Sequence, residues 1–423
     1  MKRILILGAG TAGTMMANHL SKKQKSHTWE ITIVDEATKH YYQPGFLFLP
    51  FGTYSEKDIE RPIRQFLPKS VNYIQAGIDR IVGDENLVLL QNGQKLNYDL
   101  LIIATGTQIA PDEVEGMLDN WQEDVFDFYT FEGARALREK LANWKGGRLV
   151  VHISEMPIKC PVAPLEFAFL ADDFFQKKGM RDRVSISYVT PMSGAFTKPT
   201  AAKKLGHLLD EKNIEVVSDF AIARVDNEHK KIIDYGGQEV GYDLLVTVPP
   251  NLGNPCIARS DMGDDYNFVP TDKHTLQSKA YENIFVLGDA TNLPTSKAGS
   301  VAHFQAEILT ENILLYLEGK ALKADFDGHA NCFVETGKNK ALLIDFNYEQ
   351  EPVTGTFPIP GVGPLQLLKE SRLNHWGKLA FRWIYWNMLL PARPLPFVTP
   401  KMKTAGKNIA PVAKGENKQV LQD

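Results

Sequence analysis

The sequence predicts an α/β protein, because short apolar segments typical of buried parallel strands alternate along the chain with segments of helical spacing. The first apolar segment runs directly into the glycine-rich stretch Gly8-Ala9-Gly10-Thr11-Ala12-Gly13, and the pattern of strand, helix and strand returns after Gly147. The stretch Tyr242-Asp243-Leu244-Leu245-Val246 also resembles Tyr98-Asp99-Leu100-Leu101-Ile102. These observations predict two tandem Rossmann-like dinucleotide-binding domains, the second inserted into the first, followed by a separate C-terminal region.

Length and composition support this organisation. A chain of 423 residues is long enough for two or three domains. We place the first domain at residues 1–110 and 270–330, the second at 111–269 and the C-terminal region at 331–423. The net charge of −4 gives no field that favours nucleic acid, and 43% apolar residues argue against disorder.

The three cysteines, Cys160, Cys256 and Cys332, are too few for a disulfide scaffold and favour an intracellular protein. The N-terminus favours the same interpretation, since Met1-Lys2-Arg3 is followed at once by an apolar strand and a glycine loop rather than by a cleavage site. No run of 18 apolar residues occurs in the sequence. We therefore expect neither a signal peptide nor a spanning helix.

The first 35 residues carry the dinucleotide-binding fingerprint. A strand at 4–7, a glycine loop, a helix from Thr14 and a strand at 31–34 follow one another in the required order. Gly8 allows the tight turn, Gly10 lets the backbone approach a pyrophosphate, and Gly13 lets the helix pack on the strand. Asp35 stands at the distance expected for an acid that binds a ribose hydroxyl.

Two later segments indicate which nucleotide is bound. The strand that ends in Ala104-Thr105-Gly106, and the strand that runs into Gly288-Asp289, resemble the paired signatures of flavoproteins with two dinucleotide domains. In those proteins the first turn lies against FAD and the second places a carboxylate near the ribityl chain. Either strand alone could be an ordinary core strand, so the inference depends on their order after the glycine loop. The helix expected at 300–317 would direct its positive end toward the flavin.

The second domain repeats the plan without its glycine loop. Strands are expected at 184–189, 214–217 and 244–248, a helix at 201–213 and a hairpin-like segment at 224–241. The strand at 149–153 is followed by two prolines and Cys160, and no glycine occurs between Gly147 and Gly179. Without a second phosphate cradle, NAD(P)H is not the expected electron donor. A thiol stands where a second nucleotide would lie.

These features together resemble the sulfide:quinone oxidoreductases, which are two-dinucleotide-domain flavoproteins related to flavocytochrome c sulfide dehydrogenase. The resemblance covers nearly the whole chain. Its most specific part is a pair of cysteine loops, Pro157-Ile158-Lys159-Cys160 and Asn331-Cys332-Phe333-Val334-Glu335. It also includes Glu166 and Tyr41-Tyr42-Gln43-Pro44, and we add Gln43 and Lys297 to the residues expected to bind FAD.

The resemblance implies that FAD-dependent oxidation turns sulfide into sulfane sulfur or polysulfide through a Cys160–Cys332 bridge, with electrons passing to membrane quinone. Hydrosulfide is a good nucleophile that can attack a disulfide sulfur. Lys159 is expected to lower the pKa of Cys160, and Glu166 to move protons. No metal is expected. Cys256 lacks such a context, and we interpret it as structural.

The chain departs from the family pattern in one segment. Many members carry a further cysteine and a histidine before the first redox loop, whereas residues 121–132 contain neither. This departure favours non-covalent FAD.

The C-terminal region suggests where electrons leave. Residues 363–393 are rich in leucine and hold three of the six tryptophans, and residues 364–407 carry eight Lys or Arg against one acid. The resulting +7, in a chain of net −4, predicts a helix in the membrane interface, on the cytoplasmic face. The alternative is a core helix with a solvated face. We expect quinone near Phe333, Phe346 and Phe357. The redox residues precede 340, so the tail should be dispensable for flavin reduction.

Two alternatives remain open at this point. A sulfide dehydrogenase that passes electrons to a cytochrome should carry an export signal and lack the basic aromatic tail. In a non-catalytic flavin-binding redox sensor, bleaching of the bound FAD should be too slow to support turnover. Self-association of the chain is also left open.

Overall fold

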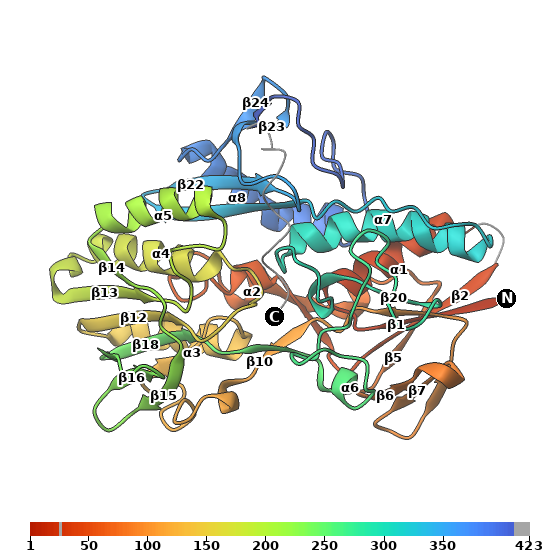
Figure 1. The fold of residues 1–423 in the computed structure, drawn as a ribbon, viewed down its shortest axis with the longest axis horizontal. Coiled ribbons are helices and arrows are strands. Elements are labelled where there is room, and N and C mark those ends of the chain that lie inside the picture. Colours follow the sequence, from red (N-terminus) through yellow and green to blue (C-terminus); the bar gives the residue numbers. More distant parts are fainter. Residues whose placement is uncertain (25–27, 410–423) are drawn as a thin grey trace.

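Two parallel five-stranded sheets lie side by side in the computed structural model, which describes residues 1–24 and 28–409 (Figure 1). The first sheet has the order β20-β9-β1-β2-β5 and consists of β1 (Lys2–Leu7), β2 (Trp29–Asp35), β5 (Val71–Gln75), β9 (Leu100–Ile103) and β20 (Ile284–Val286). The second has the order β11-β18-β12-β13-β14 and consists of β11 (Val125–Phe126), β12 (Gly147–Ile153), β13 (Val184–Val189), β14 (Ile214–Val217) and β18 (Leu244–Val248). The Rossmann-like α/β prediction is confirmed.

Helices cover the two sheets and begin close to where the sequence places them. The helix expected from Thr14 starts three residues earlier, since Gly10 serves as its N-cap. The longer helices are α1 (Thr11–Lys23), α3 (Phe131–Asn143), α4 (Ala163–Lys177), α5 (Pro199–Glu211) and α7 (Gly299–Leu317), and the short ones are α2 (Glu56–Ile59) and α6 (Pro255–Ala258).

Small antiparallel sheets complete the two halves. The hairpin-like segment of the second half forms a three-stranded sheet, and the first half contains a matching one. A two-stranded sheet joins the halves where the chain crosses between them, at Thr107–Ile109 and Asn251–Gly253. The strands are β3 (Lys39–Tyr41) with β4 (Glu60–Pro62), β6 (Ile78–Val82) with β7 (Leu87–Leu90) and β8 (Lys95–Asn97), β15 (Ile222–Asp226) with β16 (Lys231–Asp234) and β17 (Glu239–Gly241), and β10 with β19.

The duplication extends to individual side chains. Arg3 at the start of β1 donates to both carboxylate oxygens of Asp99, with Nη2 to Oδ1 at 2.9 Å. Arg148 at the start of β12 makes the same two contacts with Asp243, with Nη2 to Oδ1 at 3.1 Å. The matching ion pairs explain why Tyr-Asp precedes β9 and β18 alike: each aspartate anchors the arginine at the start of the neighbouring strand.

The C-terminal elements lie across both halves, along one side of α4, α5 and α7 (Figure 1). A hairpin of β21 (Ala330–Gly337) and β22 (Lys340–Phe346) is followed by β23 (Thr354–Ile359), β24 (Gly363–Leu367), α8 (Arg372–Ile384), a π-helical turn at Tyr385–Leu389 and β25 (Lys407–Asn408). The C-terminal region was expected to extend to Asp423, but residues 410–423 lie outside the described residues. Within the described ranges, every helix is too short or too polar to cross a bilayer.

The predicted amphipathic helix exists, but its faces differ from those we expected. Tyr385 and Trp386 pack in the main core, and Lys378 is buried as well. The exposed side carries Leu373, Trp376 and Trp383, which are 47%, 64% and 62% exposed. The expected cluster of lysine, arginine and aromatic rings at the surface is therefore wrong in part, because α8 turns its polar residues inward.

The turn after α8 reaches the glycine loop through a chain of hydrogen bonds. The Tyr385 hydroxyl lies 2.6 Å from Thr11 Oγ1 and 2.7 Å from His40 Nε2, and His40 Nδ1 lies 3.3 Å from the Ala9 carbonyl oxygen. Burial lowers the pKa of His40 to about 4, so the ring is neutral at pH 7. Its Nδ1–H then donates to Ala9, and Nε2 accepts from Tyr385.

We expect Tyr385→Phe to lower the free energy of unfolding by about 1–3 kcal/mol, because the buried His40 ring and the partly buried Thr11 hydroxyl each lose a hydrogen-bond partner. Chemical denaturation of the FAD-loaded protein measures this change. Tyr235→Phe is the matched control, since Tyr235 is 82% exposed and should give no change. Equal stability of the two variants would show that the Tyr385 hydroxyl does not hold the C-terminal region in place.

Candidate functional site

A single continuous pocket brings together most of the predicted site residues. Its wall is formed by the glycine loop, the ends of β9 and β20, the loop before α4, β21 and α8. The predicted residues that line it are Gly8, Gly10, Asp35, Gln43, Ala104, Thr105, Gly106, Lys159, Cys160, Glu166, Gly288, Asp289, Lys297, Cys332 and Phe333.

The glycine loop forms a cradle that larger residues would fill. Gly8 has a φ of +97°, and a Cβ there would lie 2.4 Å from the Ala104 carbonyl oxygen. A Cβ on Gly13 would lie 1.8 Å from the Gly8 carbonyl oxygen, so Gly13 packs behind the loop rather than in the pocket wall. Gly10 caps α1 without a side-chain hydrogen bond, and no acid stands in the first turn. The free N–H groups at this helix end can bind a pyrophosphate.

The other predicted cofactor residues surround the same cavity. The Asp35 carboxylate accepts from the backbone N–H groups of Ala9 and Ala37 at 2.6 and 2.9 Å, which fixes it beside the loop. Thr105 Oγ1 is buried and has no hydrogen-bond partner among the described residues. Lys297 donates to the carbonyl oxygen of Asp289 at 2.9 Å, and burial lowers its pKa to about 8. An unpaired hydroxyl and a phosphate cradle in one pocket fit a dinucleotide.

Cys160 lies in a loop held by backbone contacts. Its φ of 48° is left-handed, and its N–H donates to the Lys297 carbonyl oxygen at 2.7 Å. Its own carbonyl oxygen accepts from the Tyr129 hydroxyl at 3.2 Å and from the Ala163 N–H at 2.9 Å. These three bonds fix the loop, so the thiol is directed by the surrounding backbone. Tyr129 lines the pocket and was not predicted.

Cys332 stands on a strand rather than in the loop that we expected. It lies within β21, opposite Ile344 of β22, and lines the pocket with Cys160. Both are free thiols in this structure. Burial raises the pKa of Cys332, and the nearby charge of Cys160 raises it further. The two sulfur atoms therefore face the same space. Cys256 is fully buried in a separate cluster, as its structural interpretation requires.

Lys159 is not the main cation that acts on Cys160, so this expectation is corrected in part: burial lowers the pKa of Lys159 and Cys160 acts to raise it, which shows that the two charges attract each other. Burial raises the pKa of the Cys160 thiol to about 12, and the cation that opposes the rise most is Lys378 of α8. Lys159 instead donates to Gln43 Oε1 at 3.1 Å, with its ammonium 5.8 Å from the centroid of the Tyr129 ring. Lys159 is next to Cys160 in sequence, but its side chain extends toward Gln43.

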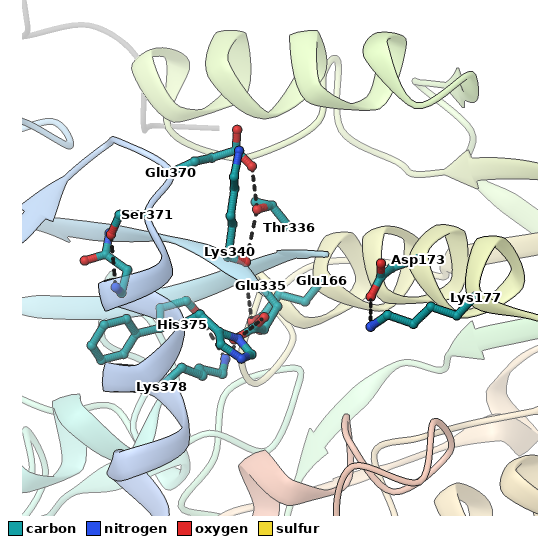
Figure 2. Close-up of polar contacts among 12 residues, drawn as sticks. Glu166, Asp173, Lys177, Glu335, Thr336, Lys340, Glu370, Ser371, His375 and Lys378 are labelled. Carbon is teal, nitrogen blue, oxygen red and sulfur yellow. Dashed lines mark hydrogen bonds and ion pairs between the residues drawn. The ribbon is translucent and has the colours of Figure 1, made fainter. Parts of the chain in front are cut away.

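Glu166, in the first turn of α4, forms a buried ion pair with Lys378 (Figure 2). Lys378 Nζ lies 2.6 Å from Glu166 Oε1, and the same oxygen accepts from the Glu335 N–H at 2.7 Å. The second oxygen, Oε2, is buried and has no partner among the described residues. Burial raises the pKa of Glu166 to about 7, although Lys378 lowers it. A carboxyl group that titrates near neutrality beside two thiols is suited to move protons.

Of the three phenylalanines expected near quinone, only Phe333 lines the pocket. Phe357 of β23 packs against the same small apolar cluster as Phe333 but does not line the pocket. Phe346 is buried in the main core, with the Lys198 ammonium 5.6 Å from its ring centroid. Phe381 lines the pocket in their place, because α8, which is remote from the redox cysteines in sequence, packs against the pocket.

The structure adds Lys378, Phe381 and Tyr385 to the site and overturns the separation expected between tail and redox centre. All three line the pocket that holds Cys160. A sequence signal for the inward face existed: Asn374 and Lys378 are polar, one helical turn apart, within an aromatic segment. Truncation before α8 would remove part of the redox pocket and would not isolate quinone reduction.

Comparison with known proteins gives consistent results. A family profile described as pyridine nucleotide-disulphide oxidoreductase matches residues 2–306. The mitochondrial sulfide:quinone oxidoreductase of Dictyostelium discoideum is 29% identical over 398 residues, which are 92% of this chain and 86% of that protein. The mitochondrial sulfide:quinone oxidoreductase of Mus musculus is 27% identical over 92% of this chain and 86% of its own length. The crystal structure of the sulfide:quinone oxidoreductase from Aquifex aeolicus superposes with a TM-score of 0.75 at 23% identity, covering 92% of each chain.

The raised pKa of Glu166 predicts a pH-dependent stability. The folded state binds this proton more tightly than the unfolded chain, whose carboxyl titrates near the ordinary value of 4.5. The stability contributed by the group is therefore complete below about pH 4.5 and is lost as the pH rises through about 7. Between pH 5 and pH 8, we expect wild type to lose about 2 kcal/mol of unfolding free energy relative to Glu166→Gln.

Denaturant unfolding at the two pH values measures this difference. Glu228→Gln makes the same change at an exposed carboxyl and should follow the wild type. Parallel pH curves for wild type and Glu166→Gln would mean that Glu166 is ionised throughout this range.

Proposed function

Because the chain belongs to the pyridine nucleotide-disulphide oxidoreductase family, we propose that it is a sulfide:quinone oxidoreductase that oxidises sulfide to sulfane sulfur and passes the electrons to quinone. The observation that carries this proposal is the meeting of Cys160 and Cys332, 172 positions apart in sequence, in the pocket that also contains the dinucleotide cradle. No glycine loop follows β12, so a nicotinamide nucleotide has no second cradle. Sulfur is then the source of electrons.

FAD is the cofactor, and the residues of the pocket fit it. Gly10 leaves room for a pyrophosphate at the start of α1, Asp35 beside the loop would hold a ribose hydroxyl, and Thr105 Oγ1 is a buried hydroxyl without a hydrogen-bond partner among the described residues. When bound, FAD accepts two electrons from sulfur and returns them to a quinone. Ala298, Gly299 and Ser300 line the pocket where α7 begins, so the positive end of that helix faces the cavity.

The two cysteines perform the sulfur chemistry in this proposal. With Cys160 and Cys332 joined as a disulfide, hydrosulfide attacks one sulfur, forms a new S–S bond and releases the other cysteine as a thiolate. No electrons leave the sulfur atoms in this exchange. Closure of the thiolate onto the persulfide gives a trisulfide and releases two electrons and one proton. FAD held in the pocket would supply the oxidant, and Glu166 would be the base that receives the proton.

The charged groups of α8 and α4 assist this exchange. A thiolate in a buried pocket is costly, which the raised pKa of Cys160 reflects. Lys378 lowers that pKa, so it stabilises the released thiolate. Glu166 is protonated when the Lys378 ammonium stabilises the thiolate. Hydrogen bonds to β21 hold both residues: Lys378 donates to the Phe333 carbonyl oxygen at 3.0 Å, and Glu166 accepts from the Glu335 N–H.

Quinone enters from the α8 side in this proposal. Phe333 and Phe381 line the pocket there and supply apolar walls for a ring. The outer face of the same helix exposes Leu373, Trp376 and Trp383, and exposed Lys369, Arg372 and Arg393 flank it in sequence. Tryptophans with neighbouring cations favour peripheral docking on an anionic membrane. A lipid-soluble quinone would then reach the pocket without crossing water.

We expect Cys160→Ser and Cys332→Ser each to keep bound FAD but to lower sulfide-dependent quinone reduction by about 10³-fold or more, because neither single thiol can form the bridge. Anaerobic bleaching by sulfide followed by quinone addition measures both half-reactions. Cys256→Ser is the matched control and should retain turnover. Turnover in either pocket variant would refute the bridge, and bleaching by NADH as fast as by sulfide would refute the assigned donor.

We expect the double change Trp376→Ser and Trp383→Ser to weaken binding to anionic liposomes by at least about tenfold, since each large apolar side chain contributes roughly 1.5–3 kcal/mol when buried. Sedimentation with liposomes measures binding, and sulfide bleaching should be unchanged because neither ring lines the pocket. Tyr235→Ser removes an equally exposed aromatic ring from the second domain and is the control. Undiminished sedimentation of the double variant would place the membrane contact elsewhere.

A further inference from the structure

The redox pocket needs a supply of protons, and the carboxyl group that handles them in the proposed reaction is buried. Taking the proposed function as the premise, oxidation of hydrosulfide with reduction of quinone to quinol consumes one proton in each turnover. Glu166, the carboxyl nearest the thiols, is 0% exposed. It must therefore exchange its proton either through the mouth of the pocket or through neighbouring titratable groups.

A second carboxylate and a histidine lie directly behind Glu166 (Figure 2). Glu335 follows Cys332 by three residues on β21, is 1% exposed, and donates its own N–H to Glu166. Both of its carboxylate oxygens lie 2.9 Å from His375 Nδ1. His375 precedes Lys378 by three residues, so the same face of α8 presents one cation to Glu166 and an imidazole to Glu335.

The two carboxylates are shielded from solvent, whereas the two basic side chains are partly exposed. The Glu166 and Glu335 side chains are 0% and 1% exposed, whereas Lys378 is 10% and His375 is 12% exposed. His375 uses Nδ1 toward Glu335, which leaves Nε2 on the opposite edge of the ring. An imidazole that carries a proton on either nitrogen is suited to pass one from solvent to a buried carboxylate near neutral pH.

We propose that His375 and Glu335 form the route by which Glu166 exchanges protons with solvent. A proton binds at His375 Nε2, and the proton on Nδ1 passes to Glu335. No direct hydrogen bond joins the Glu335 carboxylate to Lys378 in the structure, so the next transfer uses a bridging water or a swing of the Lys378 side chain. From Lys378 the direct contact of 2.6 Å leads to Glu166.

The charged and titratable groups around this route come from several elements. Cys160 faces Glu166 from the loop before α4, and Cys332 faces it from β21. Tyr54 lies within electrostatic range of both Lys378 and Glu335. Glu370 accepts from Thr336, the neighbour of Glu335, at 2.6 Å. Among the described residues, none of these groups hydrogen-bonds to the Glu335 carboxylate, whereas His375 does and is partly exposed.

The test follows proton uptake during photoreduction of the FAD-loaded protein, without sulfide or quinone. A pH-indicator dye in weakly buffered solution records uptake, and flavin absorbance records reduction. In wild type, uptake should keep pace with reduction. In His375→Ala, reduction should be unchanged and uptake slower by roughly tenfold or more, and added imidazole should restore it. Glu335→Gln should show the same delay without rescue by imidazole.

His229→Ala is the matched control, because His229 also pairs with a carboxylate, Asp226, but on the exposed surface of the second domain. It should behave as wild type. Uptake at the wild-type rate in His375→Ala and Glu335→Gln would overturn the route and assign protons to the pocket mouth. A delay in His375→Ala that imidazole does not restore would also overturn it, because His375 would then act only in packing. A wild type that cannot pass electrons from sulfide to quinone contradicts the proposed function, yet the photoreduction experiment still decides the proton route.

Discussion

The ion pair between Glu166 and Lys378 is the interaction on which the architecture of the site depends. It joins the first turn of α4 in the second domain to α8 in the C-terminal region, and the Glu335 N–H adds β21 to the same point. Removing one partner of a buried pair typically costs about 3–5 kcal/mol, because the other charge is left uncompensated. Three separate parts of the chain must therefore meet correctly before either thiol faces the cofactor cradle.

The second domain shows how a duplicated nucleotide fold can acquire sulfur chemistry. Strand order and the arginine–aspartate anchors are retained in both copies. The connection after the first strand differs, with the glycine cradle after β1 and the Cys160 loop after β12. The connection between the second and third strands differs as well, since it holds β3, α2 and β4 in the first copy and α5 in the second. The carboxyl ends of parallel strands are the usual binding edge of such sheets, so a changed loop there alters the ligand without altering the fold.

The C-terminal helix serves two surfaces at once. Its inner face supplies Lys378 and Phe381 to the redox pocket and His375 to Glu335, while Trp376 and Trp383 are exposed on the outer face. This arrangement departs from the usual amphipathic helix, which buries apolar and exposes polar residues, because the buried Lys378 shares the inner face with apolar residues and two tryptophans are exposed. The charged groups on the inner face are stable there because they pair with groups on α4 and β21. The exposed apolar side chains of the outer face would be buried if the protein docks on lipid.

The sequence by itself determined the fold class and the glycine cradle with Asp35, because local spacing and turn chemistry carry these signals. The pairing of Cys160 with Cys332 came from the resemblance to the sulfide:quinone oxidoreductases, and both cysteines line the pocket. Strands β13, β14 and β18 have the bounds that were expected from their apolar runs. Only the tertiary structure decided which cation most lowers the pKa of Cys160, which phenylalanines line the pocket, and that His375 pairs with Glu335. Lys159 adjoins the cysteine yet reaches Gln43, whereas Lys378 is 218 positions away and lowers the thiol pKa. Electrostatic and packing partners depend on distance in space, and sequence spacing within one element cannot report a contact between elements so far apart in the chain.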